Sequence, residues 1–99
     1  MGSKSRSKGA RIELEVLHEL QDAGLDCEKL SYIYKKTHDM RLKMLGKDRR
    51  MEIKCRANGF ATIYKWLEPV DVLVLRADRK QALAVIPIAT LIELIKGAK

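Results

Sequence analysis

The sequence has few cysteines and no long hydrophobic segment. Its two cysteines, Cys27 and Cys55, form no C-x-x-C motif and no cluster with histidine. We therefore expect reduced, buried structural thiols rather than a disulfide or a zinc site. No run of about 18 apolar residues occurs, which argues against a transmembrane helix. The basic start lacks the apolar stretch of a signal peptide, and Arg6 stands where a myristoylation motif needs serine or threonine. Together these absences predict a cytoplasmic protein.

Positive charge is the strongest feature that is present. Lysine and arginine number 20 against 13 acidic residues, which gives a net charge of +7 in 99 residues. A chain of this length has room for one compact domain, and 46% hydrophobic residues are enough for a core. In so small a domain the excess favours a polyanionic partner, with nucleic acid ahead of an anionic membrane surface. No helix combines a basic face with a strongly apolar one, so we expect no membrane association.

The chain divides into a basic start and a patterned remainder. Residues 1–10 are mostly glycine, serine, lysine and arginine, which predicts a flexible basic arm. Residues 11–99 are expected to form a single domain. Their patterns predict a helix over 11–23, strands over 26–36 and on both sides of a turn at 45–48, a helix over 60–67, strands over 70–75 (central and buried) and 82–86, and a last helix opened by a capping box at Thr90. This αβββαββα order predicts an α/β fold with a mixed sheet flanked by helices.

Residues 37–56 show the two-residue alternation of a β-hairpin. The apolar positions of the two strands, expected to face a core, are Met40, Leu42, Met44, Met51, Ile53 and Cys55. The polar positions, expected to face outward, are Asp39, Arg41, Lys43, Arg50, Glu52, Lys54 and Arg56. If Met44 pairs with Arg49, Asp39 lies opposite Lys54 and diagonal to Glu52, at about 5 Å and 7–8 Å. The outward face then gathers these three side chains around one point.

Glu13 is a carboxylate in the middle of the apolar face of the first helix. On a helical wheel, Val16, Leu17 and Leu20 lie on either side of it within about 60°. An unpaired buried carboxylate is costly, so two interpretations remain open. Glu13 either lies at the edge of the face and reaches water or an arginine, or it projects toward a metal ion beside the sheet.

Three carboxylates and one lysine form the candidate catalytic centre, namely Glu13, Asp39, Glu52 and Lys54. Hard oxygen ligands suit Mg²⁺, with Mn²⁺ possible, and the backbone carbonyl of Ile53 is a further candidate ligand. A metal so held polarises a phosphoryl oxygen and activates water. Lys54 is placed to orient the attacking water or to stabilise the charge that develops.

The order and spacing of these residues resemble the PD-(D/E)XK nuclease superfamily. The resemblance rests on Glu13 in the first helix, Asp39 at the start of a strand and Glu52-Ile53-Lys54 on the next strand, and it spans about residues 8–96. The small size, basic arm and short hairpin look most like the archaeal-type Holliday junction resolvases. His38 departs from the family pattern, which usually has proline or glycine before the aspartate.

The resemblance implies a restriction-endonuclease-like core and a Mg²⁺-dependent endonuclease. It implies that Glu13, Asp39 and Glu52 are metal ligands and that Lys54 is the catalytic lysine, with no small-molecule cofactor. The expected substrate is branched DNA, a four-way junction that receives paired symmetric cuts. Because such a junction has two-fold symmetry, two matched cuts require two active sites, and we expect a homodimer.

Candidate DNA contacts are basic residues of the arm, of the segment before the hairpin and of its outer face: Lys4, Arg6, Lys8, Arg11, Lys35, Lys36, Arg41, Lys43 and Arg56. They show no base-reading pattern, which predicts recognition of DNA shape and backbone. Two alternatives stay open. One is a nickase or small nuclease of a phage or mobile element, with the same site and another DNA substrate. The other is a non-catalytic basic nucleic-acid-binding module whose carboxylates are merely solvated.

Overall fold

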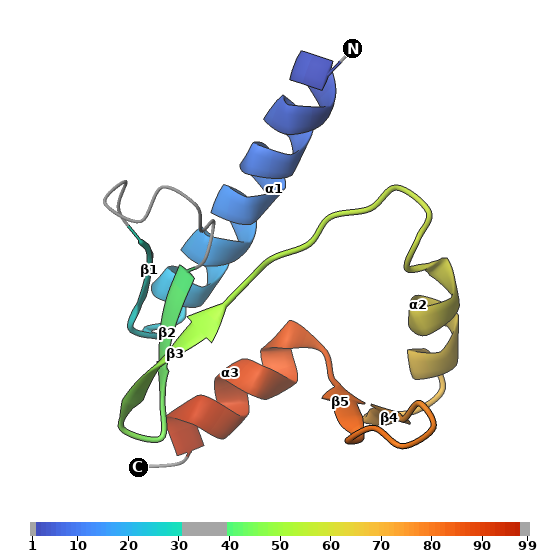
Figure 1. Ribbon diagram of the computed structural model, residues 1–99. Coiled ribbons are helices and arrows are strands. Elements are labelled where there is room, and N and C mark those ends of the chain that lie inside the picture. The colour runs from blue at the N-terminus through green and yellow to red at the C-terminus, as the bar shows by residue number, and fades with distance from the viewer. Residues whose placement is uncertain (1, 31–39, 98–99) are drawn as a thin grey trace. The chain divides into compact units, whose positions relative to one another are not determined.

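The computed structural model describes residues 2–30 and 40–97, and the side chains of residues 2–8 and 10 are not described. Its elements are α1 (Gly2–Asp22), β1 (Cys27–Lys29), β2 (Met40–Met44), β3 (Lys47–Met51), α2 (Ala61–Leu67), β4 (Leu73–Leu75), β5 (Leu83–Val85) and α3 (Ile88–Gly97) (Figure 1). The fold is therefore mixed α/β, and its elements follow the predicted αβββαββα order. The described strands form two small antiparallel sheets, β1-β2-β3 and β4-β5, where one mixed sheet was expected. Among the described residues, no helix is long and apolar enough to cross a membrane.

By its internal contacts the chain divides into two units. Unit 1 comprises Met1–Cys55 and Ile95–Lys99, and unit 2 comprises Arg56–Leu94. The first helix and the three-stranded sheet therefore belong to unit 1. The second helix, the two-stranded sheet and most of α3 belong to unit 2. Each unit is described on its own below.

Helix α1 begins at Gly2, so the helix continues back through the segment in which a flexible arm was expected. No proline interrupts this segment, and lysine, arginine and alanine are good helix formers. The end predicted at residue 23 agrees with the structure to within one residue, and Gly24 just beyond it has a positive φ of 94°. The amide of Gly24 donates to the carbonyl of Gln21, and the amide of Leu25 donates to that of Leu20. This pair of bonds is a Schellman motif, which glycine accommodates without a steric penalty.

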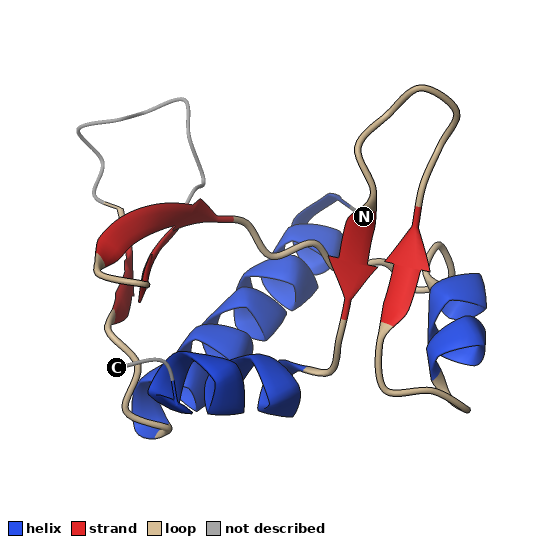
Figure 2. Ribbon diagram, turned by 90° about the horizontal axis from the view of Figure 1, so that it is seen from below, coloured by secondary structure: helices blue, strands red, loops and turns tan. Residues whose placement is uncertain are grey.

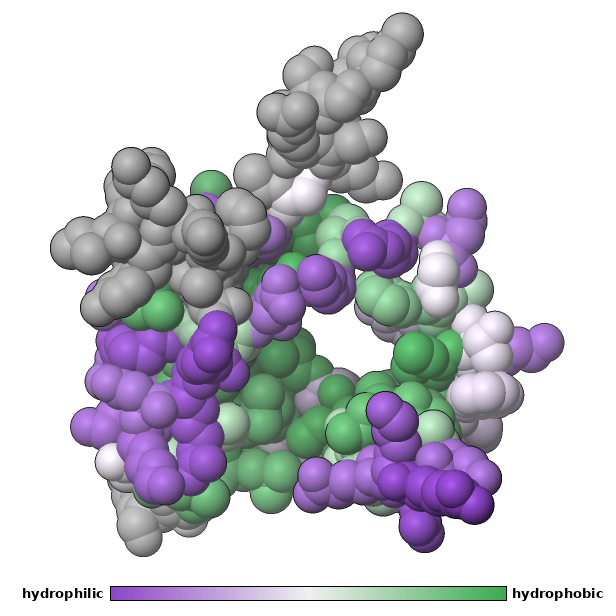
Figure 3. All heavy atoms as spheres, viewed as in Figure 1, coloured by the Kyte–Doolittle hydropathy of each residue, from purple (hydrophilic) through white to green (hydrophobic). Residues whose placement is uncertain are grey.

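The core of unit 1 lies between α1 and the sheet. Its buried side chains are Leu17, Leu20, Leu25, Cys27, Met40 and Leu42. The lower half of α1 lies beside β1 (Figure 1). The side chain of Gln21 joins α1 to β1, since its Nε2 donates to the Cys27 carbonyl over 2.8 Å. The inward face predicted for the first hairpin strand is thus confirmed, and charged residues cover the outer face of the hairpin (Figure 3).

The hairpin has a tighter turn than expected. Met44 pairs with Lys47 and Met40 with Met51, so the assumed pairing of Met44 with Arg49 is wrong. The turn consists of Leu45 and Gly46 alone, and both have positive φ values, of 53° and 77°. This is the geometry of a type I′ turn, whose twist matches that of the flanking strands. Strand β3 ends at Met51, so the Glu52-Ile53-Lys54 tripeptide follows the strand instead of lying within it.

Unit 2 has few side chains shielded from solvent. None of its residues is buried, and its large exposed hydrophobic residues are Tyr64, Trp66, Val70, Val72, Val74, Leu83 and Leu94. The prediction of a central buried strand over 70–75 was therefore wrong. Strand β4 pairs with β5 in a two-stranded ribbon (Figure 2), and alternation turns Val74 away from the half-buried Leu73 and Leu75.

Prolines lie just after α2 and just before α3, at positions 69 and 87. Helix α2 begins after Phe60 and ends at Leu67, within one residue of the helix predicted over 60–67, and Tyr64 on this helix is exposed. Helix α3 begins at Ile88, so the predicted start at Thr90 was late. The carbonyl of Pro87 accepts bonds from the amides of Thr90 and Leu91. Because proline has no amide hydrogen to satisfy, it is well tolerated where a helix begins.

Candidate functional site

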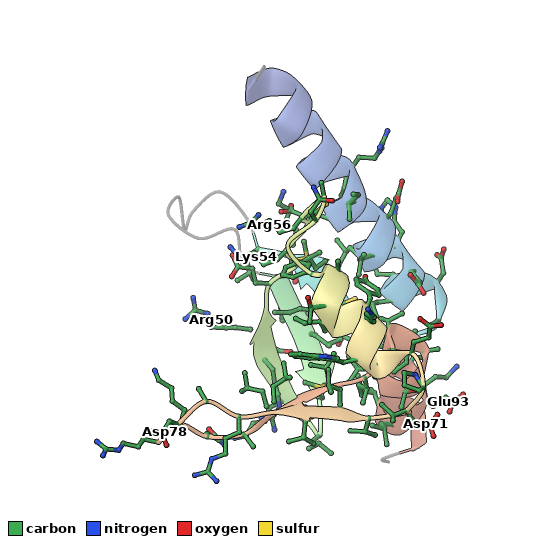
Figure 4. All side chains as sticks on the ribbon, turned by 90° about the vertical axis from the view of Figure 1, so that its right-hand side faces the viewer. Arg50, Lys54, Arg56, Asp71, Asp78 and Glu93 are labelled. Atoms are coloured by element: carbon green, nitrogen blue, oxygen red, sulfur yellow. The ribbon has the colours of Figure 1, made fainter. Side chains whose placement is uncertain are left out.

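Glu52 and Lys54 lie side by side directly after β3. Lys54 Nζ is 3.3 Å from Glu52 Oε1, and the two side chains are 58% and 50% exposed. The exposed and half-buried positions continue to alternate from Glu52 to Arg56, with Ile53 half-buried between the pair. An extended backbone projects residues i and i+2 to the same side, which explains the contact. Figure 4 shows Arg50 reaching outward from the hairpin, with Lys54 and Arg56 farther along the segment that leaves it.

Glu13 lies on the buried side of α1, as the helical wheel predicted. Its side chain is 26% exposed, and Glu13 Oε2 is 3.9 Å from Lys29 Nζ at the end of β1. The carboxylate thus has a lysine partner, where sequence reasoning considered water, an arginine or a metal ion. The lysine was missed because residues 26–36 alternate poorly, which hid the face on which Lys29 lies.

The third expected carboxylate, Asp39, lies outside the described residues, as do His38, Lys35 and Lys36. Within the described part of the chain, no three histidine, cysteine, aspartate or glutamate side chains lie close enough to hold a metal ion. Glu13 and Glu52 are hard oxygen donors of the kind Mg²⁺ uses. A three-carboxylate site that includes them depends on Asp39.

Arg41 contacts three carboxylates on the outer face of the sheet of unit 1. Its Nη2 donates to Asp26 Oδ1 over 2.8 Å, its Nη1 to Asp48 Oδ1 over 2.9 Å, and its Nε to Glu28 Oε1 over 3.3 Å. The Arg41 side chain is 19% exposed, whereas each of the three acidic side chains is about 60% exposed. We call these four residues the Arg41 cluster. We expected Arg41 to contact DNA. In the structure its nitrogen donors instead bond to carboxylates of the protein.

The Arg41 cluster shifts the protonation equilibria of its members. The hydrogen bond from Arg41 lowers the pKa of Asp26 below its ordinary value of 3.8, and Lys43 adds to this effect. Asp26 and Asp48 in turn raise the already high pKa of Arg41. Asp26 and Arg41 are therefore both charged at neutral pH. Sequence reasoning missed the three acidic partners, although the pairing of Glu28 with Arg41 across β1 and β2 follows once the register is known.

The other basic candidates have varied surroundings. Arg11 is exposed and lies 3.9 Å from Glu15 on the next helical turn. Lys43 is exposed beside Arg41 on the outer face of β2, and Arg56 is exposed at the start of unit 2. The side chains of Lys4, Arg6 and Lys8 are not described, although their backbone belongs to α1. The described basic positions thus stay on the surface, where a polyanion can reach them.

Both cysteines are thiols, as predicted, but only Cys27 is buried as expected. Cys27 is buried in β1, and burial raises the pKa of its thiol above the ordinary value of 9.0. Cys55 is half-buried at the end of unit 1. The pKa of Cys27 is thus unlike that of a nucleophilic cysteine, which is lowered by its surroundings.

Comparisons with protein-family models, with curated proteins and with solved structures found no match to this chain.

Proposed function

We propose that this protein is a metal-dependent, structure-selective DNA endonuclease of the PD-(D/E)XK type, acting as a homodimer on four-way junctions. The proposal rests on the sequence resemblance, and the observation that supports it best is the contact between Glu52 and Lys54. A carboxylate and a lysine two residues apart, exposed on one side of the chain where a strand ends, have the composition of a phosphodiester-cleaving centre. The net charge of +7 provides the long-range attraction for DNA.

In this proposal the protein's own side chains bind the metal ion, orient a water molecule and donate hydrogen bonds. Glu52 is a ligand whose present partner is Lys54, and an incoming cation would compete for the same oxygen. The bound metal would polarise the scissile phosphate and lower the pKa of a water molecule. Lys54, once released from Glu52, could hold that water or the developing negative charge with its ammonium hydrogens. Glu13 and Asp39 complete the proposed ligand set, and Glu13 would have to exchange Lys29 for the metal.

One observation favours the non-catalytic alternative, a basic nucleic-acid-binding module. Glu13 and Glu52 each have a lysine within 4 Å, and such pairs stabilise carboxylates without a metal. Under this alternative the acidic residues neutralise nearby lysines, and the excess basic residues bind DNA through its phosphates. Binding would then occur equally with and without divalent ions, and no strand would be cut.

Cleavage of a labelled four-way junction tests the proposal. The junction is incubated beside a linear duplex of the same sequence, with Mg²⁺ and with EDTA, and Asp39→Asn serves as the inactive variant. Asp39→Asn keeps the size of the side chain and removes its charge. The expected result is a pair of symmetric cuts in the junction alone, dependent on both the metal and Asp39.

The remaining outcomes separate the alternatives. Cuts in both substrates would indicate a nuclease or nickase without selectivity for junctions. Tight binding of junction and duplex with no cleavage in Mg²⁺ or Mn²⁺ would leave the binding module. Loss of binding in Asp39→Asn together with cleavage would point to a folding defect, which circular dichroism would reveal.

A further inference from the structure

The two-stranded ribbon of unit 2 is apolar on both of its faces. Strands β4 and β5 consist of leucine, valine and alanine alone. Leu73 and Leu75 are half-buried on one face, whereas Val74 and its pairing partner Ala84 are exposed on the other. Val72 is exposed as well, and alternation places it on the side of Val74. We call Val72, Val74 and Ala84 the Val74 face. Strands without a polar face are typical of sheets that are covered on both sides.

The described part of unit 1 has no apolar face to match this one. Unit 2 has seven large hydrophobic residues that are exposed, whereas the described residues of unit 1 have two, Leu14 and Leu45. The apolar side chains of unit 1 already pack between α1 and the inner face of its sheet, and charged residues cover the outer face. A second copy of unit 2, by contrast, carries an apolar face of the same size and shape.

The two units also divide the net charge unequally. Unit 2 has five basic and four acidic residues, so it contributes only +1 to the net charge of +7. These residues are Arg56, Lys65, Arg76, Arg79 and Lys80, against Glu68, Asp71, Asp78 and Glu93. Two copies of unit 2 therefore approach each other with little repulsion. Two copies of the strongly basic unit 1 repel each other and attract a polyanion.

The charges of unit 2 that lie near the ribbon are placed at its ends. Figure 4 shows Asp78 at the loop that joins β4 to β5, and Asp71 and Glu93 toward the opposite end. Within the loop, Arg76 Nε donates to the carbonyl of Lys80 over 3.0 Å. The middle of the ribbon is thus apolar and its ends are charged. An apolar centre with a polar rim is the usual composition of a protein–protein interface.

We propose that the Val74 face binds the same face of a second copy of this chain, so that unit 2 forms the homodimer and unit 1 is left for DNA. A two-fold axis sets a surface against its own equivalent, and an apolar, nearly neutral face is complementary to itself. The assignment deepens the proposed function, which requires a homodimer for paired cuts. The association itself does not depend on cleavage.

Two variants of Val74 and one control test the proposal. Val74→Lys places a charge in the centre of the interface, and does so twice in each dimer because the contact is symmetric. Val74→Thr keeps the branched Cβ that favours strands and adds only a hydroxyl group, so it replaces Val74→Lys if that variant does not fold. Gln81→Lys is the matched control, because it adds the same charge at an exposed position between β4 and β5.

Sedimentation velocity over a range of protein concentrations gives the dissociation constant of the dimer. We expect Val74→Lys to raise this constant at least about 100-fold, since like charges that face each other across an interface are costly. Val74→Thr should raise it at least about tenfold, because each copy buries an unpaired hydroxyl group. Gln81→Lys should keep the wild-type constant. The wild-type dimer should persist at high salt, which screens charges and leaves apolar contacts intact.

Nuclear Overhauser contacts locate the interface directly. Carbon-labelled and unlabelled wild-type protein are mixed, and only the contacts that join the two copies are recorded. We expect the methyl groups of Val72 and Val74 in one copy to contact those of the same residues in the other.

Cleavage of the four-way junction separates this inference from the proposed function. A monomeric Val74→Lys keeps Glu52 and Lys54, so it should still cut, but its two cuts should no longer occur in one binding event, and singly nicked junctions should accumulate. A wild type that forms this dimer without cleaving would end the proposed function and leave the inference in place. Paired cuts by a Val74→Lys variant that remains dimeric would do the opposite.

Three results would overturn the inference. One is a wild type that stays monomeric over the whole concentration range. Another is a dissociation constant that is equal in the wild type, Val74→Lys and Val74→Thr, which would place the dimer contact elsewhere. The third is a set of Overhauser contacts that joins Val72 and Val74 only to residues of their own chain, because the face would then be covered without a second copy.

Discussion

Arg41 and Asp26 are joined by a 2.8 Å hydrogen bond that links β2 to the segment between α1 and β1. The amide of Lys43 donates to the carbonyl of Asp26 over 2.8 Å at the same place. Asp26 is therefore held both by its side chain and by its backbone carbonyl. The exposed Asp26 carboxylate thus has a fixed partner, which makes its protonation a sensitive measure of whether the sheet of unit 1 is intact.

The pKa of Asp26 should depend on Arg41. Because the folded-state pKa lies below 3.8, the unfolded chain takes up the proton first as the pH falls. The stabilisation is fully present above about pH 5 and is lost as the pH falls through the folded-state value. We expect Arg41→Gln to raise the pKa of Asp26 toward 3.8, measured by carbon NMR of the carboxyl group. A Lys29→Gln control should leave it unchanged, and an equal pKa in wild type and Arg41→Gln would contradict the observed contact.

Truncation of Leu20 should destabilise the protein far more than truncation of Leu14. Leu20 has no exposed surface, whereas Leu14 on the same helix is 44% exposed. Removing a fully buried leucine costs the lost burial and leaves a cavity, so we expect Leu20→Ala to lower the free energy of unfolding by about 2–5 kcal/mol. Urea denaturation followed by circular dichroism measures the difference. Equal effects of Leu20→Ala and Leu14→Ala would place the core elsewhere.

Sequence reasoning succeeded where one pattern had one outcome. Alternation identified the inner face of β2, and Gly24 identified the end of α1, because only a residue that tolerates positive φ completes that motif. The wheel also placed Glu13 on the buried side of its helix, although its partner Lys29 could not be foreseen from a poorly alternating segment.

Prediction failed where two outcomes share one pattern. The predicted hairpin register was wrong because a two-residue and a four-residue turn both keep the alternation of inner and outer residues, so alternation alone does not fix the pairing. Residues 70–75 were expected to be buried because an apolar run is typical of a central strand. In the structure only Leu73–Leu75 of this run form β4 of a two-stranded sheet, and Val74 is 63% exposed. A sequence of this kind specifies an extended chain without specifying what covers it.

The two thiols should react at different rates. Cys27 is buried and its pKa is raised, so little reactive thiolate is present and reagents reach it only after local opening. Cys55 is half-buried. With iodoacetamide at pH 8, we expect Cys27 to be alkylated at least about tenfold more slowly than Cys55, as followed by peptide mass spectrometry. In denaturant the two rates should converge, and equal rates in the native protein would show that β1 is open.

Replacement of Lys54 should separate catalysis from binding. If Lys54 stabilises charge in the transition state, Lys54→Ala should lower the junction-cleavage rate by about 10²–10³-fold, as the loss of one such donor does in other enzymes. Its single charge is a small part of a net charge of +7, so junction affinity should change little. Lys80→Ala, which removes an exposed lysine between β4 and β5, is the control and should cleave at the wild-type rate. A Lys54→Ala variant that cleaves at the wild-type rate would show that Lys54 has no part in the mechanism.

Lys54→Arg sharpens the test, since it keeps the charge but changes the donor geometry. Activity retained in Lys54→Arg and lost in Lys54→Ala would show that charge near Glu52 suffices.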